Sequence, residues 1–317
     1  MNGSLYVCAG EQVQAYNAQT GAQIWSATAG GNTETSSPAV ANGIVYVAPD
    51  IADGNLYAFN AKTGAKLWVA SSGGITSTDA SPATSNGLVY ENWVDGQLYA
   101  FNGSNGKTTW TKTLAGGTDA SPVVSQGILY QGTLDGQLYA FNATTGRQLW
   151  TVSIPGGSGV YTTPAVANGT LYVGVGLTIF NNTPTLYAFN AKTGAIIWSM
   201  DKGVPDGGPS TLLSVAHGIV YAYAGDISAF NAKTGAKLWS TTTGGLPTEP
   251  SSSPSTANDV VYTGSFEGKV YAFNARTGKV LWSYQTGGSV FSVPIVMNGI
   301  LYAGSDDFSL YAFHLPS

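Results

Sequence analysis

The chain has 317 residues, 43% of them hydrophobic and 12% aromatic, which is enough apolar material for a large core. Only 9% of the residues are charged and the formal net charge is −5. Nucleic-acid binding is disfavoured because no basic stripe is present to neutralise phosphates. No apolar run approaches the roughly 18 to 20 residues that a membrane helix needs. MNGSLYV at the start has neither the basic nor the apolar region of a signal peptide.

In chain order, the predicted elements repeat. A degenerate copy of the repeat motif, VQAYNAQTGAQIW, ends at Trp25. The copy used here as the reference, LYAFNAKTGAKLW, spans 56–68. Further copies end at Trp110, Trp150, Trp198, Trp239 and Trp282, and a truncated one, LYAFHLPS, closes the sequence. Successive tryptophans are 40 to 48 residues apart. A period of that size indicates a propeller or a solenoid array.

One period contains four predicted strands, which we name A to D. In the second copy they cover 38–40, 44–48, 55–59 and 66–70, joined by turns at Asn42-Gly43, Asp53-Gly54 and 61–64. No window shows a sustained 3.6-residue apolar period, so helix is not expected. Four antiparallel strands per period predict an all-β fold, a β-propeller whose blades are four-stranded sheets.

We expect a single propeller domain over 1–317. The predicted blades are 1–28, 29–72, 73–114, 115–154, 155–201, 202–242, 243–286 and 287–317. The first and last blades are incomplete, which leaves thirty predicted strands. Eight blades are favoured over seven, because seven would leave two apolar strands with uncovered edges. Because the first predicted blade begins at the A–B turn, at Asn2, we expect that the chain once began earlier and lost a segment. Alternatively, two molecules complete one another. Both a monomer and a strand-exchanged dimer are therefore compatible with the sequence.

The repeat motif has a structural logic. Asn60 is expected to hydrogen-bond the turn that follows it, and Gly64 to supply a left-handed conformation. The tryptophan is too large for one twisted sheet to bury, so it is expected to pack against the neighbouring blade. The residues with this predicted docking role are Trp25, Trp68, Trp110, Trp150, Trp198, Trp239 and Trp282.

The pattern [LV]-Y-A-[FY]-[ND]-A-x-T-G-x-x-x-W resembles the repeat of the PQQ-type, or quinoprotein, β-propellers, and this resemblance covers nearly the whole chain. The family includes quinone-dependent dehydrogenases, and also cofactor-free propellers such as outer-membrane assembly lipoproteins and sensor domains of bacterial kinases. It implies an extracellular or periplasmic location. It also implies what a quinone site would need: a vicinal cysteine pair, an arginine and a carboxylate near the quinone, and a calcium ion.

These requirements are not met. Cys8 is the single cysteine, and the two arginines, Arg147 and Arg276, fall in C–D turns. The two histidines, His217 and His314, replace turn residues of the repeat, so neither a metal site nor a histidine-based catalytic site is expected. No cofactor, neither PQQ nor calcium, is expected.

Charges are predicted to separate between the two ends of the blades. The D–A loops and B–C turns share one end of a blade, and the A–B and C–D turns share the other. Fifteen of the seventeen acidic residues fall at the first end, the exceptions being Glu91 and Asp259. Nine of the twelve basic residues belong to the C–D end: Lys62, Lys66, Lys107, Arg147, Lys192, Lys233, Lys237, Arg276 and Lys279. Duplication of the repeat, together with its turn residues, is enough to explain this separation of charge. The resulting electric field would still attract cations to the acidic end.

A candidate binding site lies within the acidic end. Asp79 and Asp119 occupy the same position, three residues before the proline of strand A, in adjacent blades. Glu34 lies one residue before the corresponding position of the second blade, and aromatic residues, Tyr161 and Phe291, occupy it in two others. Clustered carboxylates favour hard cations, and an acidic and aromatic rim also suits an amine or a sugar.

Glu91 and Trp93 also break the pattern, in strand B of the third blade, and alternation places them on one side of the strand. We expect them to form the ligand-binding site together with Asp79 and Asp119. A tryptophan outside the motif is either a stacking platform for a sugar or a cation, or a filler between blades.

The predicted function is a non-catalytic binding or scaffolding propeller. Its acidic loop face would meet a small-molecule ligand or a protein partner, with a cationic or saccharide ligand favoured. Two alternatives stay open: a degenerate quinoprotein or carbohydrate-active enzyme, and a consensus-like scaffold without a natural ligand. The second alternative arises because the nine residues 60–68 recur identically at 231–239.

Overall fold

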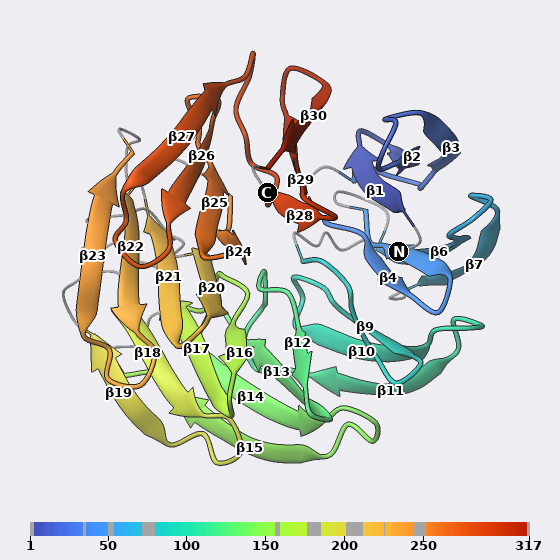
Figure 1. The fold of residues 1–317 in the computed structure, drawn as a ribbon. Coiled ribbons are helices and arrows are strands. Elements are labelled where there is room, and N and C mark those ends of the chain that lie inside the picture. The colour runs from blue at the N-terminus through green and yellow to red at the C-terminus, as the bar shows by residue number, and fades with distance from the viewer. Residues whose placement is uncertain are drawn as a thin grey trace. The chain divides into compact units, whose positions relative to one another are not determined.

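The computed structural model describes residues 3–33, 36–49, 54–71, 80–155, 159–175, 185–200, 212–224, 226–243 and 252–315. Within these ranges it contains thirty β-strands and no helix (Figure 1). The strands form eight antiparallel sheets, six with four strands and two with three. The fold is therefore the predicted all-β, eight-bladed β-propeller with incomplete first and last blades. The alternative of seven blades is wrong, because eight separate sheets are present.

The sheets belong to two compact units, Met1–Val160 and Tyr161–Ser317. Each unit contains four sheets, and in each four-stranded sheet the strands are hydrogen-bonded in chain order. The strands of the first unit are β1 (Ser4–Ala9), β2 (Gln12–Asn17), β3 (Gln23–Thr28), β4 (Ala39–Ala41), β5 (Ile44–Val47), β6 (Asn55–Asn60), β7 (Lys66–Ser71), β8 (Ala83–Ser85), β9 (Leu88–Asn92), β10 (Gln97–Asn102), β11 (Thr108–Thr113), β12 (Val123–Ser125), β13 (Ile128–Gly132), β14 (Gln137–Asn142) and β15 (Gln148–Ser153).

The second unit repeats this arrangement. Its strands are β16 (Ala165–Ala167), β17 (Thr170–Val175), β18 (Thr185–Asn190), β19 (Ile196–Met200), β20 (Leu212–Ala216), β21 (Ile219–Ala224), β22 (Asp226–Asn231), β23 (Lys237–Thr242), β24 (Ser255–Ala257), β25 (Val260–Gly264), β26 (Lys269–Asn274), β27 (Val280–Gln285), β28 (Ile295–Met297), β29 (Ile300–Ser305) and β30 (Ser309–His314).

The reversals of the chain have the predicted chemistry. At the A–B turn of the second sheet, Asn42 and Gly43 have φ values of 52° and 76°, as a two-residue hairpin turn requires. His217 has a φ of 50° at the corresponding turn of the sixth sheet, so it serves there as a turn residue. At the C–D turn, Asn60 Oδ1 accepts hydrogen bonds from the backbone N–H groups of Lys62 and Thr63, both at 3.0 Å. The expected role of Asn60 is thereby confirmed.

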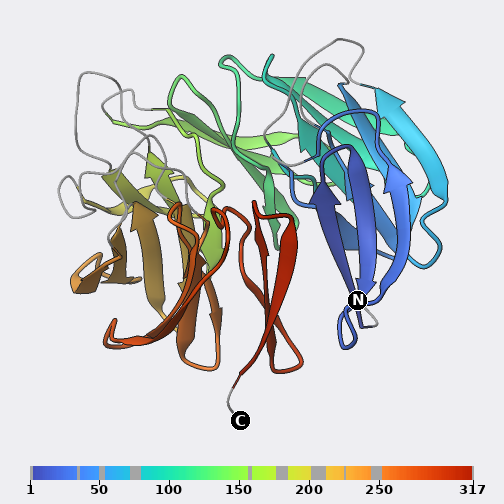
Figure 2. The same cartoon turned by 90° about the horizontal axis from the view of Figure 1, so that it is seen from above.

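The core lies between neighbouring sheets within each unit. Between the second and third sheets, for example, Tyr46 and Leu56 of one sheet pack with Val89 and Phe101 of the next, and all four side chains are buried. Alternation along the strands explains this layering, because successive side chains point to opposite faces and each face meets a different neighbour. Figure 2 shows the strands of individual sheets side by side, for instance β1, β2 and β3. Each sheet thus depends on its neighbours for burial.

Adjacent sheets are joined by a recurring pair of donors, which we call the Tyr–Trp clamp. The tyrosine of strand B and the tryptophan of strand D both donate to one backbone carbonyl in the C–D turn of the next sheet. Tyr46 Oη and Trp68 Nε1 lie 3.1 and 3.0 Å from the carbonyl oxygen of Gly103. The same geometry joins Tyr6 and Trp25 to Ala61, Tyr90 and Trp110 to Ala143, Tyr172 and Trp198 to Ala232, and Tyr221 and Trp239 to Ala275.

The motif glycine is also part of this contact. A Cβ atom at Gly64, whose φ is 71°, would lie 2.7 Å from the ring of Trp25. Gly106 stands in the same relation to the ring of Trp68, also at 2.7 Å. The glycine is therefore required twice, by its left-handed backbone and by the indole that lies against it.

Candidate functional site

Hydrogen bonds between turns fix which loops share an end of a sheet. The N–H of Ala61, in a C–D turn, donates to the carbonyl of Gly43 in the A–B turn at 2.8 Å. At the opposite end, the N–H of Leu114 at the start of a D–A loop donates to the carbonyl of Gly96 in the B–C turn at 2.9 Å. We call the end with the D–A loop and the B–C turn the loop end, and the other the turn end.

Asp119 lies at the loop end of the fourth sheet, in the loop that leads into β12. Its side chain is partly buried, and this burial raises the pKa of the carboxyl group above its usual 3.8. The loop is held in place beside it, because Ser121 Oγ accepts a hydrogen bond from the N–H of Ser81 in the preceding sheet at 2.8 Å. Ser81 Oγ accepts the N–H of Ser37 in the same way, at 2.8 Å. The innermost segments of three sheets are thus linked in series.

A buried polar network lies next to Asp119. Thr118 Oγ1 accepts a hydrogen bond from Gln131 Nε2 at 2.6 Å and donates to the carbonyl of Gly132 at 2.9 Å. Asn92 Nδ2, from the preceding sheet, donates to the Thr118 carbonyl at 3.2 Å. All three side chains are fully buried. Asn92 Oδ1 and Gln131 Oε1 have no hydrogen-bond partner among the described residues, so two acceptor oxygens lie unused in this network.

The sequence prediction did not include Thr118, Asn92 or Gln131. A signal was present, because Gln131 occupies the position of Glu91 one repeat later, where the other copies carry Val, Ala or Thr. Two consecutive blades therefore have a long polar side chain at a buried strand-B position. Glu91 itself is fully buried, and its Oε1 accepts the N–H of Asn92 at 3.0 Å.

Trp93 is buried between the second and third sheets, with 0% of its surface exposed. Its ring meets those of Tyr99 and Phe101 edge-on, with centroids 5.0 and 6.2 Å away. A ring with no exposed surface has no face on which a sugar or a cation can stack. The sequence left two roles open for Trp93, a stacking platform and a space-filling side chain between blades. The buried position of the ring agrees with the second role.

The remaining candidates are spread over the chain. Glu34 and Asp79 lie outside the described residues, so their distances to Asp119 stay untested. Tyr161 and Phe291 occupy D–A loops of the second unit and are 36% and 38% exposed. Phe291 contacts Phe266, with ring centroids 6.1 Å apart. In the described part of the chain, no three His, Cys, Asp or Glu side chains gather closely enough to hold a metal ion.

The model of the family described as outer membrane protein assembly factor BamB matches residues 1–121, 94–241 and 223–315. The chain belongs to this BamB family. No curated protein matched the sequence. Within the described ranges, no helix has the length and apolar character needed to cross a bilayer.

Solved structures with the BamB-family fold cover almost the whole chain. BamB from Moraxella catarrhalis superposes with a TM-score of 0.79 at 23% identity, over 98% of this chain and 91% of that one. The computationally designed Ika8 protein gives 0.78 at 17% identity, over 99% and 93%. Quinohemoprotein alcohol dehydrogenase from Comamonas testosteroni gives 0.73 at 16% identity, over 95% and 68%. At these identities the likeness establishes the fold, and membership of the BamB family supports a non-catalytic binding or scaffolding propeller that engages other proteins.

Proposed function

We propose that this protein is a non-catalytic binding propeller outside the cytoplasm, and that the loop end around Asp119 holds a cationic segment of a partner protein. The observation that carries the proposal is the partly buried Asp119 carboxylate at the loop end of the fourth sheet. A cationic group that donates hydrogen bonds would compensate this carboxylate. Glu34 and Asp79 are proposed to complete the site from the neighbouring blades.

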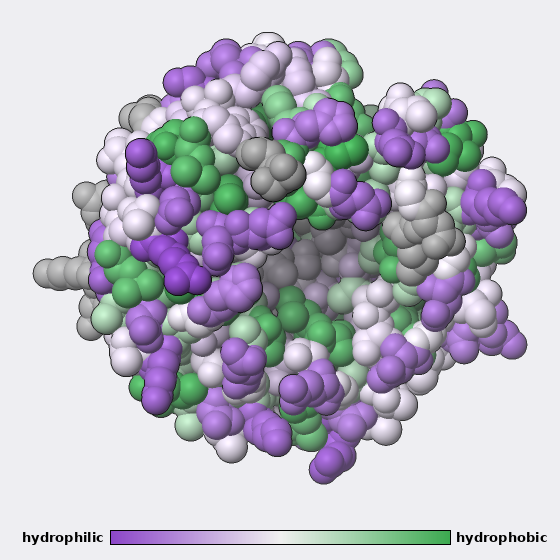
Figure 3. All heavy atoms as spheres, viewed as in Figure 1, coloured by the Kyte–Doolittle hydropathy of each residue, from purple (hydrophilic) through white to green (hydrophobic). Residues whose placement is uncertain are grey.

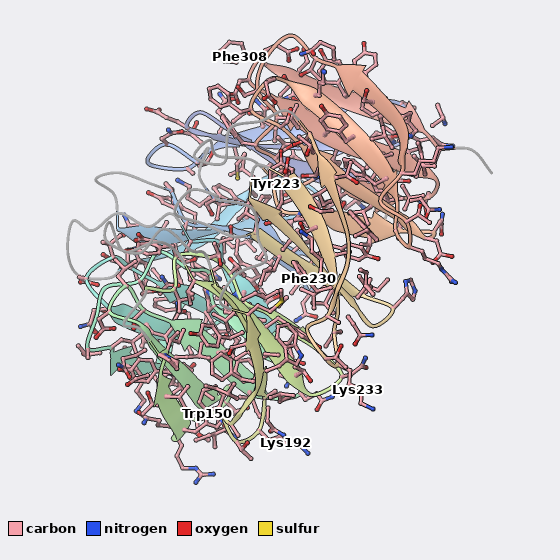
Figure 4. All side chains as sticks on the ribbon, turned by 90° about the vertical axis from the view of Figure 1, so that its left-hand side faces the viewer. Trp150, Lys192, Tyr223, Phe230, Lys233 and Phe308 are labelled. Atoms are coloured by element: carbon pink, nitrogen blue, oxygen red, sulfur yellow. The ribbon has the colours of Figure 1, made fainter. Side chains whose placement is uncertain are left out.

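Charge distribution within each unit supports the proposal. In the first unit, the described acids Glu11, Asp95 and Asp135 lie in B–C turns at the loop end. In the second unit, Lys192 and Lys233 project from C–D turns at the turn end (Figure 4). A local exception, Asp259, lies at the turn end and is 3.7 Å from Arg276, which neutralises it. A cationic partner would therefore be attracted to the loop ends.

A quinone-dependent activity is not proposed, because the residues present do not fit the cofactor. The single cysteine, Cys8, excludes a vicinal pair, and burial raises the pKa of its thiol to about 12, so the reactive thiolate is not formed near neutral pH. Arg147 lies in the C–D turn between β14 and β15, and Arg276 in that between β26 and β27. Both arginines are at the turn end, away from Asp119 or its equivalents.

The experiment compares two triple variants with a fluorescent decalysine peptide by anisotropy. Glu34→Ala, Asp79→Ala and Asp119→Ala together should weaken binding by about tenfold or more, as expected when close charge pairs are lost. The control changes the same number of charges at the same loop ends, with Glu11→Gln, Asp95→Asn and Asp135→Asn together. Equal losses in both variants would show a general acidic surface and not the proposed site.

A further inference from the structure

Beyond the Asp119 site, the second unit carries three exposed phenylalanines at its own loop ends: Phe266, Phe291 and Phe308. Phe308 lies in the turn between β29 and β30 and is 99% exposed, standing clear of the sheets (Figure 4). Phe266 and Phe291 are 42% and 38% exposed and contact one another. Hydrophobic side chains reach the surface elsewhere too, interspersed with hydrophilic ones (Figure 3), so exposure alone does not mark a site.

The backbone at Phe308 is the informative feature. Its φ is 64°, in the left-handed region that a bulky side chain rarely adopts. The same turn position in three other sheets is Gly96, Gly136 and Gly268, with φ values of 84°, 80° and 79°. In all four turns the N–H of this residue donates to the carbonyl three residues earlier, at 2.9–3.1 Å. Phe308 therefore replaces a glycine that the turn favours, and combines backbone strain with full exposure of an apolar ring.

Several hydrogen bonds hold the backbone of the turn that presents Phe308. Asp307 Oδ2 accepts hydrogen bonds from the Tyr311 hydroxyl at 2.6 Å and the Gly287 N–H at 2.8 Å, and Oδ1 accepts the Ser309 N–H at 3.0 Å. The N–H of Asp306 donates to the Ser289 carbonyl at 2.9 Å. A Cβ at Gly288 would lie 2.6 Å from the Asp307 nitrogen, so turn and loop are in close contact. The backbone that carries the ring is thus held against the loop, which lowers the entropic cost of ordering it when a partner binds.

One loop joins the three aromatic residues. Phe291 lies on the loop 286–294, Phe266 contacts Phe291, and the turn of Phe308 is hydrogen-bonded to the same loop at Gly287 and Ser289. The charged residues within the three segments that carry the phenylalanines are all negative, and Lys269, which follows at the start of β26, has its Nζ 6.0 Å from the centroid of the Tyr271 ring. Glu267 follows Phe266 and Asp306 and Asp307 precede Phe308, whereas the segments 265–268, 286–294 and 305–309 contain no lysine or arginine.

We propose that Phe266, Phe291 and Phe308 form a docking surface for a partner-protein segment in which an apolar side chain is flanked by lysine or arginine. Burial of the aromatic rings would drive association, and the acidic rim would select a basic partner over an acidic one. This surface is separate from the Asp119 site, since its residues belong to other sheets and its driving force is apolar contact.

The test uses a fluorescein-labelled peptide of alternating leucine and lysine, with leucine–glutamate and serine–lysine peptides for comparison. Phe308→Gly restores the glycine of the other turns, so we expect a higher melting temperature together with at least about tenfold weaker binding of the leucine–lysine peptide. Leu238→Ala, which removes a 48% exposed leucine from β23, should leave binding unchanged. The glutamate peptide should not bind, and the serine peptide should bind at least about tenfold more weakly.

Equal binding of the leucine–lysine peptide to wild type and Phe308→Gly would overturn the proposal. Preference for the serine–lysine peptide would reduce the surface to a charged one and would overturn it as well. Sedimentation tests a third outcome. If the wild type is a dimer and Phe308→Gly makes it monomeric, a second copy of the chain occupies the surface, and the proposal of a basic partner is refuted. The Asp119 variants should bind this peptide normally, so failure of one proposal is distinguishable from failure of the other.

Discussion

At the scale of single residues, the repeat is held by the Tyr–Trp clamp. The sequence identified the tryptophan, since it is the largest residue of the motif, but not the tyrosine of strand B that shares its acceptor. Tyr90 and Trp110 both donate to the Ala143 carbonyl, at 3.1 and 3.0 Å. Burial raises the pKa of Tyr90 to about 12, so the hydroxyl remains a donor at any physiological pH.

The clamp predicts non-additive stability effects. Tyr90→Phe alone should cost about 0.5–1.5 kcal/mol, because Trp110 still satisfies the Ala143 carbonyl. Trp110→Phe should cost more, because it also removes part of the packed ring. The double variant should cost more than the sum of the two, since it leaves a buried carbonyl without a donor. Urea unfolding monitored by fluorescence measures this, with Trp110→Ala, expected to cost about 3–5 kcal/mol, as the upper reference. Simple additivity would argue against a shared acceptor.

Asp119 gives a prediction with a definite sign. Its folded-state pKa is raised above 3.8 by burial, so ionisation of the carboxyl group opposes folding, and the penalty builds as pH rises from 3.8 to the raised pKa and is complete above it. Asp119→Asn should therefore raise the melting temperature at pH 7, and the gain should vanish near pH 3, where both states are protonated. Calorimetry at the two pH values checks this. A lower melting temperature at pH 7 would mean that the carboxylate is stabilising in the free protein.

At the scale of elements, the innermost strands depend on neighbouring sheets for hydrogen bonds. β4, β8 and β12 each have three residues, and the segments before them are linked through Ser37, Ser81 and Ser121. Short strands form few backbone hydrogen bonds with their neighbours in the sheet. Side-chain hydrogen bonds between sheets therefore contribute a larger share of the interactions that hold these strands in place.

Replacement of Ser121 tests this link. Ser121→Val should lose the bond from the Ser81 N–H, at a cost of about 1 kcal/mol, and speed hydrogen exchange of that amide. Ser121→Thr has nearly the same volume and keeps the hydroxyl, so it is the matched control, and threonine already occupies this position at Thr163. Equal exchange rates in the two variants would show that the serine link does not order the segment.

At the scale of the whole molecule, the few charged residues control how the proposed surfaces respond to salt. The chain has a formal net charge of −5 with only 9% charged residues, so its field is set by few groups. Electrostatic attraction of a cationic partner should be screened by salt over a Debye length of about 10 Å at 0.1 M.

This predicts different salt dependences for the two proposed surfaces. Decalysine binding should weaken steeply between low and 0.5 M salt, whereas binding of the leucine–lysine peptide should retain a salt-resistant part because apolar burial drives it. Anisotropy titrations at four salt concentrations measure both slopes. Parallel slopes would indicate a single, purely electrostatic mode.

The sequence alone determined the fold, because each repeat contains its own strands, turn residues and docking tryptophan. Within one repeat, local turn residues such as Asn42-Gly43 and Asn60 specify a four-stranded sheet, and no residue distant in the sequence is needed to predict it.

Only the tertiary structure decided what individual side chains do, because that depends on the neighbouring sheet. Alternation placed Trp93 on one side of its strand, and packing against the second sheet buried it completely. The unused acceptors of Asn92 and Gln131 arise where two sheets meet at Thr118. Phe308 was an ordinary turn residue in the sequence, and its left-handed, exposed state became visible once the backbone angle was known.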